Sequence, residues 1–211
     1  MRIHATSIVL LVLCAEAQAA PDLSSPKAAY RNYHQALQAG DVEAIKACVI
    51  ADEKRLGLVV AQIAYNKTER RFRDAVLKAF PAADKQLPDQ AALTLAAIEK
   101  ADAKIEANRA MLRTSVDDVP VELAKVGDAW KLDLNTLYNE DDIANVAKFR
   151  TAVAEVMDGM LPDIAGGKFS TYEAITQALQ SRVLMRAALP QEDVTTQPVG
   201  TQPSTRPGEH Q

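Results

Sequence analysis

The 211-residue sequence has few of the side chains on which many catalytic and metal sites depend. It contains 3 histidines, 2 cysteines and 1 tryptophan. His4 and His210 lie close to the two ends of the chain, so the central part has only His34. A zinc site that uses several histidines lacks its ligands here, and a catalytic triad would have to be built around one residue. We therefore expect no metal and no cofactor.

The N-terminal residues 1–19 have the pattern of a secretory signal peptide. Arg2 precedes an apolar run, residues 8–15, and small residues follow it at positions 17 and 19. The run is shorter than the roughly 20 residues that a membrane-spanning helix needs. We therefore expect removal of residues 1–19 and an exported protein, periplasmic or extracellular, without stable membrane insertion.

Cysteine is too scarce for an internal disulfide. Cys14 lies inside the expected signal peptide, where a bacterial lipoprotein carries its lipid attachment site. Such a site has a small residue immediately before the cysteine, and Leu13 stands there, so we expect ordinary cleavage near Ala19. Cys48 then remains alone, and the fold must depend on its apolar core.

Neither sign of charge dominates the chain. The sequence has 24 basic and 28 acidic residues, a formal net charge of -4, with both signs interspersed. This balance excludes the basic surface of a typical nucleic-acid-binding protein. Residues 190–211 are rich in proline, threonine and glutamine. They contain too little apolar surface to offset their chain entropy, so we expect a disordered tail.

Apolar residues at helical spacing predict helices on both sides of the middle of the chain. Ser25 and Asp41 are placed to cap the first two helices, and Gly40 ends the first. Ser170 and Glu173 have the spacing of a capping box for the last one. The expected helices cover residues 26–39, 42–49, 52–80, 89–100, 139–165 and 171–189.

Between these helices the apolar period changes from that of a helix to that of a strand. Residues 103–107 and 110–114 alternate apolar and polar side chains, which predicts a hairpin. Residues 119–124 and 130–134 alternate in the same way around a turn at Gly127-Asp128, which predicts a second hairpin. Helices, then strands, then helices indicate an α+β fold with an antiparallel sheet buried on one face.

Two groups of motifs resemble the NTF2-like (cystatin-like cone) superfamily. The first is the opening helix with its Gly40-Asp41 step, and the second is the late hairpin with Gly127, Trp130 and Lys131. The resemblance implies N-terminal helices on a curved antiparallel sheet, a pocket between them, and a possible homodimer through the outer face of the sheet. The expected organisation is a signal peptide (1–19), an NTF2-like domain (20–137), a helical extension packed on it (138–189) and the tail (190–211).

The chain departs from that family pattern in two regions. Residues 52–100 are more helical than is usual in the family, and the helical extension is additional. Either region is able to fill or cover the mouth of the cone. Enzymes of the superfamily, isomerases and dehydratases among them, use acids or histidines inside the cone, but no motif here allows such a residue to be transferred.

Four side chains are candidates for lining a pocket. Tyr30, Tyr33 and His34 share one face of the first predicted helix, and Trp130 lies on the strand expected opposite them. The alternative interpretation is that the tyrosines and the tryptophan are core residues and that His34 marks the edge of their face. No residue stands out as catalytic or as a metal ligand.

These observations favour an exported, non-enzymatic NTF2-like protein that binds a small apolar ligand or a protein partner. One alternative is an envelope-associated scaffold that uses the C-terminal helices. The other is a small-molecule isomerase or dehydratase that uses His34 or a buried acid in the cone. A cavity between the Tyr30 helix and the Trp130 strand, if open and lined by polar groups, is the feature that separates a ligand site from a packed core.

Overall fold

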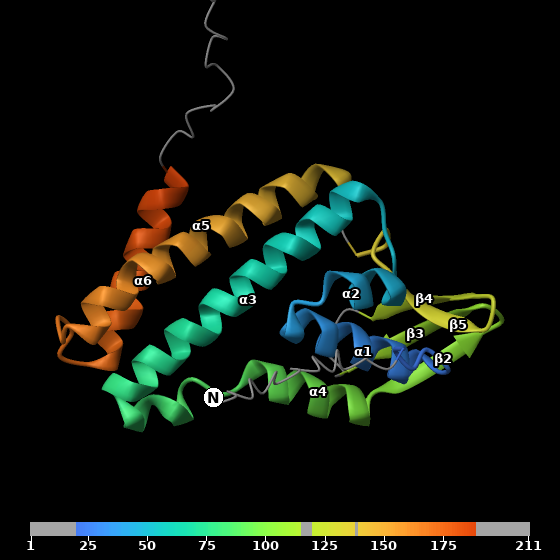
Figure 1. The fold of residues 1–211 in the computed structure, drawn as a ribbon, viewed down its shortest axis with the longest axis horizontal. Coiled ribbons are helices and arrows are strands. Elements are labelled where there is room, and N and C mark those ends of the chain that lie inside the picture. Colours follow the sequence, from blue (N-terminus) through green and yellow to red (C-terminus); the bar gives the residue numbers. More distant parts are fainter. Residues whose placement is uncertain (1–19, 115–119, 138, 189–211) are drawn as a thin grey trace, which may run out of the picture.

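The computed structural model describes residues 20–114, 120–137 and 139–188; the expected signal peptide and tail lie outside them. The fold is α+β, as predicted, with helices before and after a five-stranded sheet (Figure 1). In chain order the elements are α1 (Pro26–Ala39), α2 (Val42–Cys48), β1 (Val49–Ile50), α3 (Glu53–Ala79), the 3-10 helix η1 (Pro81–Lys85), α4 (Gln90–Lys100), β2 (Asp102–Glu106), β3 (Arg109–Arg113), β4 (Val121–Val126), β5 (Ala129–Asp133), α5 (Glu140–Ala165) and α6 (Tyr172–Ala188).

Short polar side chains set the helix starts. Ser25 and Asp41 accept hydrogen bonds from the backbone N–H groups three residues on, at Ala28 and Ala44, which confirms both predicted caps. The capping box predicted at the last helix is wrong by one residue. Thr171 caps α6 there, because its hydroxyl and not that of Ser170 accepts the N–H of Ala174.

The sheet is mixed, not wholly antiparallel as predicted. Its strand order is β1-β5-β4-β3-β2, and β1 pairs parallel with β5, with Val49 beside Leu132. The sequence pattern placed Val49 at the end of the second helix. The structure ends α2 at Cys48, and Val49 has extended backbone at φ -123°. A buried β-branched residue suits both settings, so its spacing alone did not separate helix from strand.

The β2–β3 hairpin forms where predicted, but its first strand is not half-buried. Every residue of β2 is exposed, and Ile105 is 54% exposed although it pairs with buried Ala110 on β3. β2 is an edge strand, at the opposite side of the sheet from β1, and it pairs with β3. Ala107 belongs to the turn, not to the strand, because its φ is +51°.

One apolar core lies between the sheet and the helices α1, α2 and the first part of α3. Leu112, Leu123 and Leu132 point into it from the central strands, and Ile45 and Val59 from the helices. The opposite face of the sheet is mainly charged, with Arg109 of β3 paired to Glu122 of β4. The apolar surface that this core removes from water is the main source of stability on the sheet side.

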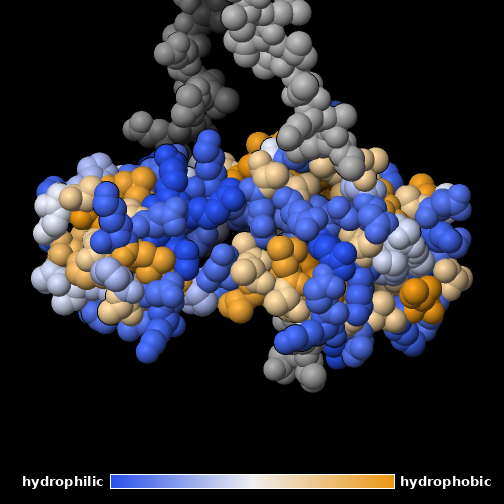
Figure 2. Space-filling view, turned by 60° about the horizontal axis from the view of Figure 1, so that its bottom comes forward, coloured by the Kyte–Doolittle hydropathy of each residue, from blue (hydrophilic) through white to orange (hydrophobic). Residues whose placement is uncertain are grey.

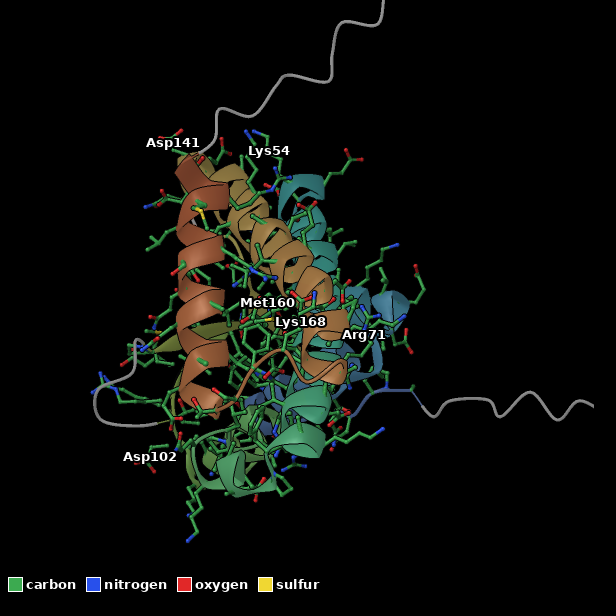
Figure 3. All side chains as sticks on the ribbon, turned by 90° about the vertical axis from the view of Figure 1, so that its left-hand side faces the viewer. Lys54, Arg71, Asp102, Asp141, Met160 and Lys168 are labelled. Atoms are coloured by element: carbon green, nitrogen blue, oxygen red, sulfur yellow. The ribbon has the colours of Figure 1, made fainter. Side chains whose placement is uncertain are left out.

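A second apolar core lies at the other end of the molecule, and Figure 3 faces that end, with Met160 of this core labelled. Phe72 and Val76 enter it from the last part of α3, Met157 and Met160 from α5, and Ile175 from α6. The helical extension therefore packs along α3, with α6 on α5, and it extends the molecule away from the sheet (Figure 1). Across the described residues, no helix combines the length and the apolar character needed to cross a membrane.

Two glycines, Gly40 at the end of α1 and Gly57 inside α3, give a matched pair of variants. Gly40 has φ +73°, and a Cβ added there would lie 3.3 Å from Ile63 Cγ2 of α3, whereas a Cβ at Gly57 inside α3 meets nothing within 4 Å. We expect Gly40→Ala to lower the free energy of unfolding by about 1–2 kcal/mol. Gly57→Ala should raise it by up to about 1 kcal/mol. Urea denaturation of both variants checks the opposite signs, and equal effects would contradict this account of α1.

Candidate functional site

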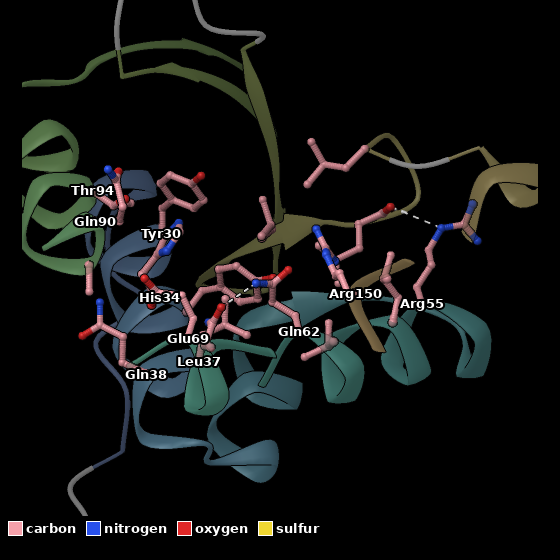
Figure 4. A pocket seen from close by; sticks show the side chains of 18 of the residues that line it. Tyr30, His34, Leu37, Gln38, Arg55, Gln62, Glu69, Gln90, Thr94 and Arg150 are labelled. Carbon is pink, nitrogen blue, oxygen red and sulfur yellow. Dashed lines mark hydrogen bonds between the residues drawn. The ribbon is translucent and has the colours of Figure 1, made fainter. Parts of the chain in front are cut away.

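A cavity of about 350 Å³ lies between α1, α3, α4 and β5 (Figure 4). The space-filling view shows the surface indented between the two ends of the molecule, with hydrophilic and hydrophobic side chains both at its border (Figure 2). Helix α3 forms the longest wall because one stripe of it, at three- and four-residue spacing, faces the cavity. The lining residues of α3 are Arg55, Leu58, Val59, Gln62, Asn66, Glu69 and Arg70.

The other walls come from α1, α4, α5, β5 and the turn that follows β5. Helix α4 contributes small and polar side chains, among them Ala91 and Thr94. Buried Leu132 comes from β5, and buried Leu134 from the turn directly after it. Arg150 reaches the cavity from α5. The result is a partly apolar, partly polar space that is open to the surface, in contrast to the buried apolar cores on either side of it.

Three of the four sequence-predicted residues line this cavity. Tyr30, Tyr33 and His34 form its α1 wall together with Leu37 and Gln38. The two tyrosine rings are stacked, with centroids 6.3 Å apart. The face shared by these residues on the predicted helix therefore becomes one wall of an open space.

Trp130 lies elsewhere. It is only 6% exposed, belongs to the sheet-side core and does not line the cavity. Its backbone N–H donates to the carbonyl oxygen of Leu23, which ties the segment before α1 to β5. Leu132, further along the same strand, and Leu134, directly after the strand, reach the cavity instead. The sequence showed which face of the strand is apolar but not how far along it the cavity lies.

His34 is held in an aromatic environment. Its ring meets Tyr30 and Tyr33 edge-on, at centroid distances of 4.6 and 5.4 Å. The Nε2 atom is buried and has no hydrogen-bond partner among the described residues. Burial lowers the pKa of His34 from 6.5 to about 4, because the charged imidazolium would lose its hydration. The imidazole is therefore neutral at physiological pH.

Arg55 is a site residue that sequence reasoning missed. Its side chain is buried at the start of α3, where the guanidinium is paired with Asp52 and its Nε donates to the Leu134 carbonyl oxygen at 3.2 Å. Asp52 also accepts the Arg55 backbone N–H and so caps α3. The three-residue spacing was visible in the sequence, but the hydrogen bond from Arg55 to the turn after β5 depends on tertiary packing.

Glu69 is a second missed residue, and its carboxyl group is partly buried in the cavity wall. Burial raises its pKa above 4.5; Asp89 adds to that increase, while Arg73 and Arg70 oppose it. Burial also raises the pKa of Tyr65, with a further contribution from the negative charge of Glu69. Two helical turns before Glu69, Gln62 donates a 2.5 Å hydrogen bond to the Asn66 side chain. A polar band thus crosses α3 between its two apolar halves.

In the part of the chain that the structure describes, no group of three or more histidine, cysteine or carboxylate side chains is arranged to hold a metal ion. A comparison with family models, curated proteins and solved structures finds no match to this chain. The site must therefore be interpreted from its own chemistry.

His34 should make the protein sensitive to acid. Its folded-state pKa is depressed, so below about pH 6.5 the unfolded chain binds a proton that the folded chain does not, and stability falls as the pH falls. Between pH 7.5 and 5, His34 should account for roughly 2 kcal/mol of lost stability. Urea denaturation of wild type and His34→Phe at both pH values measures this. The variant should lose less stability than wild type, and equal losses would show that His34 is not buried as a neutral ring.

Proposed function

We propose that this chain is an exported NTF2-like protein that binds a small, partly apolar molecule in the cavity between α1, α3 and α4, without catalysis. The observation that carries the proposal is the cavity itself, of about 350 Å³. Pockets for small ligands span roughly 300–1,000 Å³, so a compact metabolite is favoured over a large cofactor.

The lining combines the apolar surface and the hydrogen-bonding groups that a ligand site needs. Leu58, Val59 and Leu132 are buried and provide apolar surface that a ligand would cover. Gln62 and Thr94 add hydrogen-bonding groups at the wall. Apolar contact supplies most of the affinity in such sites, and a few polar groups fix the orientation of the ligand. Export and kinship with the NTF2-like superfamily rest on the sequence motifs and are part of the proposal.

A neutral fluorescent probe tests the proposal. N-phenyl-1-naphthylamine brightens when it leaves water for an apolar site, and it should bind the wild-type protein at one site. Ala91 lines the cavity from α4, so Ala91→Trp should fill the space and weaken binding by at least about tenfold.

Ala96→Trp is the matched control, because Ala96 lies on the same helix with its side chain exposed and away from the cavity. It should bind the probe like wild type. Unaltered binding by Ala91→Trp, or no binding by wild type, would contradict a ligand site in this cavity.

A second candidate function is an enzyme acting on a small molecule in the same cavity. It is favoured by the partly buried Glu69 and by Tyr30, which line the same cavity as His34. Burial raises the pKa of the Glu69 carboxyl group, and a carboxyl group beside a cavity is one of the side chains that enzymes use as general acid or base. Isomerases and dehydratases share an early step, removal of a proton next to a carbonyl group.

That step is measurable without knowing the natural substrate. Small ketones incubated with the protein in heavy water would exchange their α-protons, as followed by NMR. Glu69→Gln should abolish the exchange and leave binding of the naphthylamine probe intact. If the protein accelerates no exchange, the binding function stands and the enzymatic one is excluded for this class of substrate.

The alternative of an envelope-associated scaffold is supported by fewer observations than the ligand site. Phe149 on α5 and Leu184 and Met185 on α6 are large apolar side chains that are more than half exposed. None of them lines the cavity. They mark the surface on which a protein partner would be sought, but the cavity has the more complete set of binding features.

A further inference from the structure

We propose that two copies of this chain pair through β2, an edge strand of the sheet, and form an antiparallel dimer centred on Ile105. The inference is independent of the cavity and of the ligand proposed for it. It also differs from packing through the outer face of the sheet, because it joins the backbones of two edge strands. Its basis is the exposure of β2, the direction of its backbone groups and its pattern of charge.

β2 lies at the edge of the sheet and is open to a further strand. Within the described residues its only strand neighbour is β3, and all five of its residues are exposed. Ile105 is exposed although its pair on β3, Ala110, is buried in the sheet-side core. Such an edge offers unpaired N–H and C=O groups beside an apolar side chain, and a second strand covers both.

The backbone groups of Ala103 and Ile105 point away from the sheet. Residues of an antiparallel strand bond alternately to one side and to the other. The carbonyl oxygen of Asn108 accepts the N–H of Lys125 at 2.7 Å, so the even-numbered residues of β3 bond towards β4 and the odd-numbered ones towards β2. The partners of those odd-numbered residues on β2 are residues 102, 104 and 106. The outward groups of β2 are therefore those of Ala103 and Ile105.

The charges of β2 fit a second copy in this register. When Ile105 lies opposite Ile105 of the second copy, Lys104 lies opposite Glu106 of that copy, and Glu106 opposite its Lys104. Within one chain Lys104 and Glu106 already form an ion pair at 2.7 Å, and both side chains are exposed. The dimer does not need either charge to be free, because the two ion pairs meet side by side with opposite signs adjacent throughout. Opposite charges directly across an antiparallel pair stabilise it.

The neighbouring symmetric register, centred on Lys104, brings like charges together. It places the two lysines directly opposite each other and Asp102 opposite Glu106 of the second copy. Like charges directly opposite each other destabilise an antiparallel pair. The charge pattern of β2 therefore distinguishes two registers that its backbone groups allow equally.

A register centred on Ala103 is excluded by burial. It places Ile105 beside Ala101 of the second copy, which is only 2% exposed at the C-terminal end of α4. The register centred on Ile105 runs in the other direction, towards Ala107 and Asn108, which are exposed. The ladder is short and interfaces of small area are weak, so we expect a reversible equilibrium between monomer and dimer.

Sedimentation equilibrium at low salt measures this equilibrium, over about a hundredfold range of protein concentration that ends at about 1 mM. The weight-average mass of wild type should rise towards that of a dimer. Glu106→Lys places like charges opposite each other and should weaken association at least about tenfold. Adding Lys104→Glu to it restores opposite signs across the dimer, so the double variant should associate like wild type.

Asp74→Lys is the matched control, because it changes an acid to lysine at an exposed position of α3, in the part of that helix that packs in the second core. It should associate like wild type. Amide hydrogen exchange locates the contact. The N–H of Ile105 should exchange more slowly as the protein concentration rises, whereas that of Lys104, which points towards β3, should change little.

Three results would each overturn the dimer through β2. They are a monomer at every concentration, a double variant that associates no better than Glu106→Lys, and a dimer in which the exchange rate at Ile105 does not change. None of them bears on ligand binding in the cavity, so the two proposals succeed or fail separately.

Discussion

Helix α3 contributes side chains to two separate apolar cores, and this sharing shapes the rest of the molecule. Val59 belongs to the core under the sheet, and Phe72 and Val76 to the core with α5 and α6. A helix of 27 residues is too long to be covered by the sheet and α1 alone. Its middle part therefore crosses between the cores with one stripe open, and the cavity lies along that stripe (Figure 4).

The polar side chains on that stripe follow from the same constraint. Residues between the two cores cannot all be apolar without leaving an exposed hydrophobic surface. The α3 wall of the cavity accordingly changes from Leu58 and Val59 to Gln62, Asn66 and Glu69. A partly solvated helix needs polar side chains beside its apolar ones to remain stable. A ligand site needs the same combination, polar groups fixed on a rigid element beside apolar surface. Structure and proposed function thus have one physical origin.

Much of the fold was predictable because its signals are local. The helix starts at Ser25 and Asp41 and the apolar alternation of the central strands depend on neighbouring residues, so the sequence shows them directly. The parallel β1–β5 pairing was not predictable, because two residues after a short helix give no periodicity. For the site, the face shared by Tyr30, Tyr33 and His34 was visible. The roles of Arg55 and Glu69 depend on which elements pack opposite α3, and a single sequence does not contain that information.

The most direct test of this account is a crystal structure of the protein with N-phenyl-1-naphthylamine. We predict a single continuous α3 across Glu53–Ala79, an open cavity beside its middle turns, and the naphthylamine bound in that cavity. A cavity filled by the protein's own side chains, or the naphthylamine bound only elsewhere, would contradict it.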